Sequence, residues 1–156
     1  MPSPTLLDAL AAAPISYPFS LEEFIAQMRA LRLRPLHMHD LPAEAAGAVS
    51  GLWIATRRAD HIFVAPGASG LLRVNIILHE VSHMLLGHGR VGGDVEEVLR
   101  RLLKPTVMGA RSGRYETVEE RDAEKLATLI LTRAHTPPEN DDASLRRLSR
   151  TFGYNT

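Results

Sequence analysis

The spacing of apolar residues divides the chain into helical and extended segments. Between Leu21 and Leu33 the apolar positions recur with the period of an amphipathic helix. Ser20 and Glu23 form a capping-box pattern at the start of this run, and Pro35 stops it. The segment therefore predicts a helix with one buried face.

Three shorter runs predict strands. Arg34–His39 alternates weakly, whereas Val49–Thr56 and His61–Ala65 are rich in residues that favour β-structure. A short polar connection separates the last two runs, so they predict a β-hairpin. His37 and His39 would share one face of the first strand, where surface or edge-strand histidines are favoured over metal ligands.

The longest apolar run extends from Leu71 to Leu86 and predicts a helix that is apolar on nearly every side. A break rich in proline and glycine at 66–70 precedes it, and Gly87 and Gly89 follow it as helix-ending residues do. Further helices are predicted at Val95–Leu103, Thr117–Arg133 and Asp142–Phe152, with a flexible loop at Thr106–Arg114.

This order of helices and strands predicts an α+β fold in a single domain that spans residues 1–156. We expect a short, mostly antiparallel sheet packed on the long apolar helix and on further helices. A chain of 156 residues can bury on the order of 70% of its unfolded surface, so it needs no disulfide or metal to fold. Residues 1–18 predict a helical turn that is peripheral to the core, and residues 136–156 predict a C-terminal extension.

Composition narrows the functional classes. The 18 basic and 18 acidic residues balance, so nothing attracts the chain to nucleic acid or to an anionic membrane. No apolar stretch approaches the roughly 18 residues of a membrane span. The run Thr5–Ala13 carries Asp8 and lacks the basic start of a signal peptide, so we expect a cytoplasmic protein. The absence of cysteine excludes a disulfide framework, a thiolate-bound zinc and a cysteine nucleophile, which leaves histidine and carboxylate as metal ligands.

A His-Glu-x-x-His sequence lies inside the long apolar run, from His79 to His83, with Glu80 beside the first histidine. Residues four positions apart lie about 40° apart around a helix, so both imidazoles occupy one face. Catalytic zinc takes three protein ligands and keeps a position for water, whose pKa falls toward about 7. The spacing therefore predicts His79 and His83 as zinc ligands and Glu80 as the general base.

The alternative interpretation is a helix whose polar residues face solvent beside an apolar stripe. Burying an unpaired carboxylate next to two imidazoles costs several kcal/mol unless something such as a metal compensates. Apolar residues surround the motif on nearly every side, so its polar side chains cannot all be exposed. The apolar residues are Ile76, Ile77, Leu78, Val81, Met84, Leu85 and Leu86. This cost favours the metal site.

A third ligand must come from another part of the chain. His88 would lie about 180° from His79 on a continuing helix, so it is expected to be a helix-end residue or a partner of a ligating histidine. Glu120 and Glu124 share one face of the helix predicted downstream. Glu120 is favoured as the ligand, with Glu124 accepting a hydrogen bond from a ligating histidine. A solvated acidic face and a capping box between Thr117 and Glu120 are the alternatives.

Two segments together resemble the ImmA/IrrE family of zinc metallopeptidases. The first is the run His79–His88, which contains the motif, and the second is Glu120–Ala127. The resemblance covers Leu21–Leu131, with Ile62–Val64 in the place of the strand before the active-site helix. The chain departs from the family's usual residues mainly in the second segment, and Glu119 is therefore the alternative third ligand.

The resemblance implies a zincin-like fold and a gluzincin-like endopeptidase. Glu80 would take a proton from the attacking water and pass it to the leaving amine of the cleaved peptide. Family members typically act on helix-turn-helix repressors, so the implied partner is such a repressor. The substrate would pair in extended form with an exposed edge strand, for which His61–Ala65 is the candidate. Tyr115, His88 and His135 are candidates for the oxyanion-stabilising donor.

Two other functional classes stay open. A metal-stabilised binding module would regulate a partner by contact, without proteolysis. A toxin component of a two-gene system would act on a separate target. The binding module differs from the endopeptidase in having no need of the Glu80 carboxylate.

Overall fold

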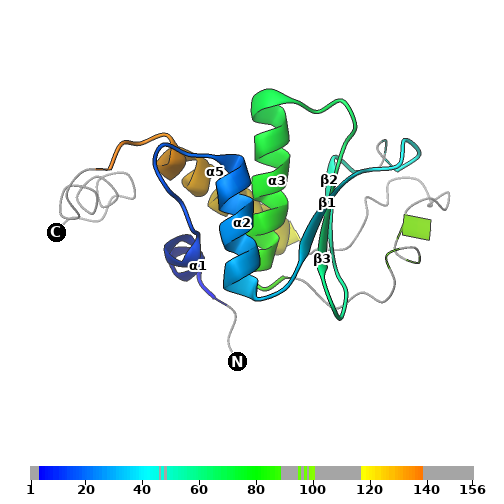
Figure 1. The fold of residues 1–156 in the computed structure, drawn as a ribbon, viewed down its shortest axis with the longest axis horizontal. Coiled ribbons are helices and arrows are strands. Elements are labelled where there is room, and N and C mark those ends of the chain that lie inside the picture. The colour runs from blue at the N-terminus through cyan, green and yellow to red at the C-terminus, as the bar shows by residue number, and fades with distance from the viewer. Residues whose placement is uncertain are drawn as a thin grey trace.

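The described part of the chain folds into four helices and one three-stranded sheet, which is an α+β arrangement (Figure 1). The computed structural model describes residues 4–45, 47, 49–88, 95, 97, 99–100 and 117–138. Its helices are α1 (Leu6–Ala12), α2 (Leu21–Arg32), α3 (Gly70–Leu85) and α5 (Thr117–Ala134). Its strands are β1 (Leu36–Asp40), β2 (Gly51–Ala55) and β3 (Asp60–Val64).

The predicted helices at Leu21–Leu33, Leu71–Leu86 and Thr117–Arg133 are confirmed as α2, α3 and α5. Only four residues of the predicted helix Val95–Leu103 are described, and all four are helical. The predicted loop Thr106–Arg114 and the predicted helix Asp142–Phe152 lie outside the described residues.

The sheet is mixed, with the strand order β1-β3-β2. β2 and β3 form the predicted hairpin and pair antiparallel, with Gly51 opposite Val64. β1 pairs parallel with β3, with Leu36 opposite Asp60. The expectation of a mostly antiparallel sheet is therefore wrong for one of its two pairings. The expectation that His61–Ala65 is an edge strand is also wrong, because β3 has a partner on both sides.

Helix α3 lies between the sheet and the other helices (Figure 1). Its apolar side chains join those of α2, α5 and one sheet face in the main core, as expected for a helix that is apolar all round. Side chains from α2, α3, α5 and the sheet are completely or almost completely buried, among them Phe24, Met28, Ile62, Leu78 and Leu126. A smaller cluster covers the opposite sheet face and contains Leu41, Ala45, Leu52, Ile54 and Phe63.

Helix α1 belongs to the core, which differs from the expected peripheral turn. Ala9 and Leu10 are buried in the main cluster, and α1 contacts α5. A reciprocal cap starts the helix, because Thr5 accepts from the amide of Asp8 and the Asp8 carboxylate accepts from the amide of Thr5. These hydrogen bonds hold the pKa of Asp8 below its usual value. The cap allows a helix of only seven residues to form where prolines on either side predict irregular structure.

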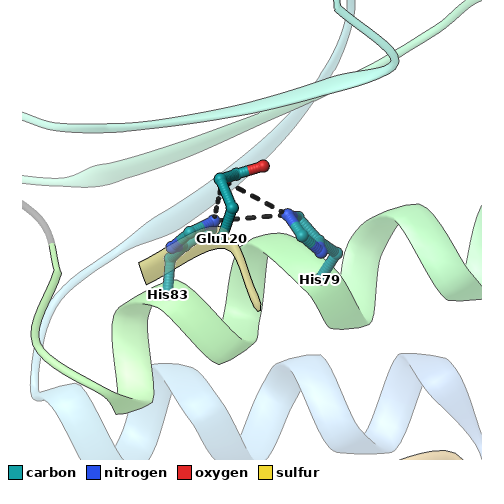
Figure 2. Close-up of side chains that lie close together, drawn as sticks. All are labelled: His79, His83 and Glu120. Atoms are coloured by element: carbon teal, nitrogen blue, oxygen red, sulfur yellow. Dashed lines mark hydrogen bonds and ion pairs between the residues drawn. The ribbon is translucent and has the colours of Figure 1, made fainter. Parts of the chain in front are cut away.

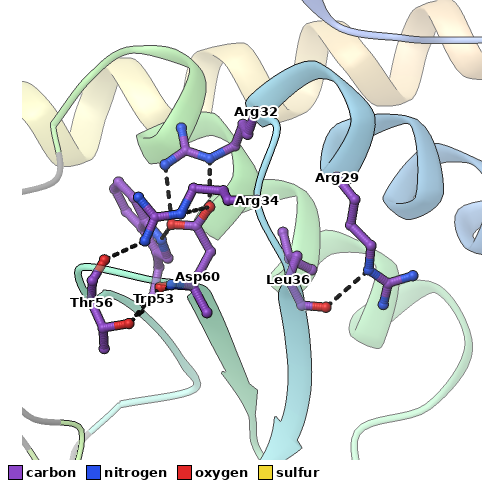
Figure 3. Close-up of polar contacts among 8 residues, drawn as sticks. Arg29, Arg32, Arg34, Leu36, Trp53, Thr56 and Asp60 are labelled. Carbon is purple, nitrogen blue, oxygen red and sulfur yellow. Dashed lines mark hydrogen bonds and ion pairs between the residues drawn. The ribbon is translucent and has the colours of Figure 1, made fainter.

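A buried carboxylate ties the end of α2 to the hairpin (Figure 3). Asp60 is fully buried and accepts from Nε and Nη2 of Arg32 at 2.6 and 3.0 Å. Its Oδ1 also accepts from the indole N–H of Trp53 at 3.0 Å. The guanidinium of Arg34 lies beside the same carboxylate and donates to the carbonyl of Thr56 in the hairpin turn. The hydrogen bonds repay the desolvation of this charge and fix β3 against α2.

None of the helices in the described ranges is long and apolar enough to cross a membrane.

Candidate metal centre

Two helices bring three donor side chains together (Figure 2). On α3 the Nε2 atoms of His79 and His83 lie 3.2 Å apart. From the first turn of α5, Oε1 of Glu120 lies 2.8 Å from Nε2 of His83 and 3.7 Å from Nε2 of His79. Among the described residues, this is the one group of three or more such side chains whose ligand atoms all lie within 4.8 Å of one another.

The spacing of these donors fits a metal ion. Ligand atoms bonded at about 2.1 Å to a tetrahedral first-row metal are about 3.4 Å apart. The three observed separations, 2.8, 3.2 and 3.7 Å, lie on both sides of that value. Without an ion, the neutral imidazoles and the carboxylate can satisfy only part of this cluster through hydrogen bonds. The group His79, His83 and Glu120 can therefore hold a metal ion.

Close helix packing is what allows Glu120 to reach the histidines. α3 and α5 pack on each other more extensively than any other pair of described elements. Ala123, one turn after Glu120, is completely buried, and Leu126 is completely buried on the same helix. A small residue at the contact lets the two backbones approach, so a carboxylate side chain spans the remaining gap.

The site has a closed side and an open side. The side chain of His83 has no solvent exposure, that of His79 is 28% exposed, and that of Glu120 is 50% exposed. An ion held by these donors is anchored in the core at His83 and accessible from the side of Glu120. A further ligand can therefore approach from solvent, which is a requirement for a catalytic site.

Glu80 follows His79 but stands outside the donor group. Its side chain is buried at 5% exposure, on the side of α3 that faces β2. A Cβ atom at Gly51 of β2 would lie 3.2 Å from Oε1 of Glu80 and 2.5 Å from Cγ2 of Ile76. Gly51 therefore lets β2 pass directly against the glutamate. Sequence reasoning missed this residue, whose only signal is a glycine at the start of a β-rich run.

His88 lies beyond the end of α3 and against His83, as expected for a helix-end residue that partners a ligating histidine. α3 ends at Leu85, and Gly87 adopts a left-handed conformation with φ of 71° that turns the chain back. Nδ1 of His88 consequently lies 2.9 Å from Nδ1 of His83. Because Nε2 of His83 faces Glu120, the two nitrogens of this ring have separate neighbours. This is the position of a residue that orients a ligating histidine.

The remaining candidates lie apart from the donor group. Glu124 is exposed, and within the described residues no hydrogen bond or ion pair joins its carboxylate to either histidine of the motif. Glu119 is half-buried beside Glu120 and is not one of the three gathered donors. His135 lies about 22 Å along α5 from Glu120 at 1.5 Å per residue, so it is too far away to act as an oxyanion donor there. Tyr115 lies outside the described residues.

Comparisons of the chain with family models, with curated proteins and with solved structures found no match.

Proposed function

We propose that this chain is a zinc-dependent endopeptidase with a zincin-like fold, similar to the ImmA/IrrE family. The observation that carries the proposal is the convergence of His79, His83 and Glu120, with Glu80 adjacent on the same helix. Two imidazoles and one carboxylate are the ligand set of many catalytic zinc sites. The open side at Glu120 gives a substrate access to such a site.

Glu80 is the general base in this proposal. When bound by His79, His83 and Glu120, zinc would supply Lewis acidity, polarising a peptide carbonyl and lowering the pKa of water. The Glu80 carboxylate accepts the proton of the attacking water and returns it to the leaving amine. Its burial beside Gly51 keeps bulk solvent away from this carboxylate.

β2 is the strand best placed to bind the substrate chain. It pairs only with β3 among the described residues, so its other edge has backbone groups that can pair with an extended peptide. Gly51 brings the face of this strand against Glu80. A peptide added along β2 would therefore carry its scissile bond past both the base and the donor group. We infer from the resemblance that the substrate is a regulatory protein, namely a helix-turn-helix repressor.

Incubation with a helix-turn-helix repressor from the same organism tests the proposal. The purified protein with zinc is expected to cut it, and a chelator or the Glu80→Gln variant is expected to abolish cutting. Glu124→Gln is the matched control, because Glu124 lies on α5 outside the donor group and is exposed. Cleavage that persists in Glu80→Gln overturns the mechanism. Repressor binding and inactivation without cleavage, equal in wild type and Glu80→Gln, would instead identify a binding module.

A further inference from the structure

A second group of histidines lies on the sheet, on strands that the candidate metal centre does not use. The parallel register places His37 of β1 opposite His61 of β3, and His39 two positions further along β1. Residues two apart on a strand share a face, so these three imidazoles gather on one face. Their ring centroids are 5.2 Å apart for His37 and His61, 5.2 Å for His39 and His61, and 6.3 Å for His37 and His39.

This face is opposite to the one that packs on α3. Ile62 and Val64 of β3 belong to the main core, so the alternating side chains of His61 and Phe63 point the other way. Phe63 belongs to the smaller cluster on that side. The sheet therefore separates the three histidines from the donor group on α3, and the two groups are independent sites.

Two of the three histidines already converge. Nε2 of His39 and Nδ1 of His61 lie 3.0 Å apart, close to the 3.2 Å between the Nε2 atoms of His79 and His83. The ring of His39 is stacked on Phe63, with centroids 4.7 Å apart, which holds its orientation. His37 and His39 are exposed, and His61 is half-buried. The pair is thus preorganised by the backbone register and remains open to solvent.

Metal ions bind the neutral form of an imidazole. Burial is the main cause that lowers the pKa of His61, and His39, His37 and Arg34 lower it further. Asp60 acts in the opposite direction but does not outweigh them.

We propose that His39 and His61, with His37 joining by rotation of its exposed side chain, form a second site for a divalent transition-metal ion. Movement of the two facing nitrogens by a few tenths of an ångström would reach the spacing of about 3.4 Å that a tetrahedral ion requires. Imidazole ligands suit Zn²⁺, Cu²⁺ and Ni²⁺, whereas Ca²⁺ and Mg²⁺ prefer oxygen. The ion clamps β1 to β3. This inference does not depend on the proposed function.

Zinc titration of the full chain tests the second site. After removal of metal, equilibrium dialysis against Zn²⁺ at neutral pH is expected to give two equivalents bound to wild type and one to His39→Ala. His135→Ala is the matched control, because His135 is an exposed histidine in neither group, and it is expected to keep both equivalents. The ring nitrogen resonances of His39 and His61 are expected to shift together during binding of one of the two equivalents.

Thermal stability gives a second readout of the zinc ion that would link β1 to β3, and it does not depend on activity. A metal that binds the folded state raises the melting temperature, so saturating Zn²⁺ is expected to raise it more in wild type than in His39→Ala. His39 is exposed, so its removal leaves the core intact, and far-ultraviolet circular dichroism checks this. Equal zinc stoichiometry in wild type and His39→Ala, or rings of His39 and His61 that do not respond to Zn²⁺, overturns the inference. If wild type binds only the zinc equivalent that depends on His39, the result counts against the proposed function and leaves this inference standing.

Discussion

His83 is the residue on which the candidate metal centre depends most. It is completely buried, and its two ring nitrogens face different partners, Glu120 on one side and His88 on the other. Such a ring has little freedom to turn, so its Nε2 is presented in one direction before any ligand binds. Most of the site's preorganisation therefore lies at this one side chain.

The identity of the third donor gives a test at the residue scale. Glu120→Gln is expected to weaken zinc binding by more than the roughly 10-fold to 100-fold that loss of an outer hydrogen-bond partner costs, because it removes a charged ligand. Glu119→Gln is expected to bind zinc like wild type. Competition with a chromophoric chelator measures both affinities. Weaker binding in Glu119→Gln and not in Glu120→Gln would exchange the roles of the two glutamates.

Gly51 gives a second test at this scale. A methyl group there meets Ile76 and Glu80, so Gly51→Ala is expected to destabilise the fold by about 1–3 kcal/mol through overpacking. It is also expected to lower proteolytic turnover while zinc affinity is kept, since no metal donor is displaced. Gly47→Ala is the control, because a Cβ at Gly47 meets nothing within 4 Å. Urea unfolding and repressor cleavage supply the measurements, and equal behaviour of the two variants would argue against contact of β2 with the base.

Sequence reasoning finds the residues whose positions follow from one helix and misses those that depend on where a helix stops. The spacing of His79, Glu80 and His83 is a property of any helix, and the structure brings the favoured Glu120 to the two histidines. The role predicted for His88, a partner of a ligating histidine, is confirmed, but its position on the far side holds only for a helix that continues. The left-handed turn at Gly87 ends it and brings His88 back.

Among the elements, the contact between α2 and the hairpin rests on one buried charge. Asp60→Ala removes the acceptor for both Arg32 and Trp53. Breaking a buried pair of this kind is expected to cost about 3–5 kcal/mol of unfolding free energy. Arg57→Ala, at an exposed arginine in the same hairpin turn, is expected to change it by no more than about 0.5 kcal/mol. Chemical denaturation of the two variants checks the contrast, and a small effect of Asp60→Ala would contradict it.

The cap of α1 makes a prediction about pH. The folded-state pKa of Asp8 lies below its unfolded value of 3.8, so its stabilising contribution is present above about pH 3.8 and is lost as the pH falls through the lowered pKa. Thr5→Ala keeps the hydrogen bond from the Thr5 amide, which is the main cause of the lowered pKa, but removes the side-chain contribution, so it is expected to move the pKa of Asp8 part of the way back toward 3.8. Carboxyl chemical shifts in an NMR titration report this pKa directly. An unchanged pKa in Thr5→Ala would mean that the Thr5 side chain does not contribute to the shift.

Periodicity predicts helices and strand faces but does not predict which strands are neighbours. The alternation of β3 correctly separates Ile62 and Val64 from His61 and Phe63. Nothing in β1 or β3 alone signals that they pair in parallel, because that depends on β1 and β2 taking opposite sides of β3. The buried side of α1 was missed for a related reason, since its two core residues become buried only when α5 packs on them.

For the whole molecule, a metal held by this group would join α3 to α5 between the buried His83 and the half-exposed Glu120. Chelation is therefore expected to lower the melting temperature, because an ion that binds only the folded state stabilises it by about 2.7 kcal/mol at 100 times its Kd. The His39→Ala background separates this effect from that of the sheet histidines. In that background, Glu120→Gln is expected to melt at nearly the same temperature with and without chelator. Calorimetry measures the melting temperatures of His39→Ala and of the double variant with Glu120→Gln, each with and without chelator. A chelator effect that survives Glu120→Gln would contradict the assigned donor.

The connection between the two halves of the site has a consequence for variation among proteins of this kind. His83 and Glu120 are 37 positions apart. The entropy of closing such a stretch grows only with the logarithm of its length, so doubling it costs about 0.6 kcal/mol. The number of residues between the two halves of the site therefore has a small effect on closing it as long as α3 and α5 still pack. A search for similar sites should match the faces of the two helices and leave the number of residues between them unconstrained.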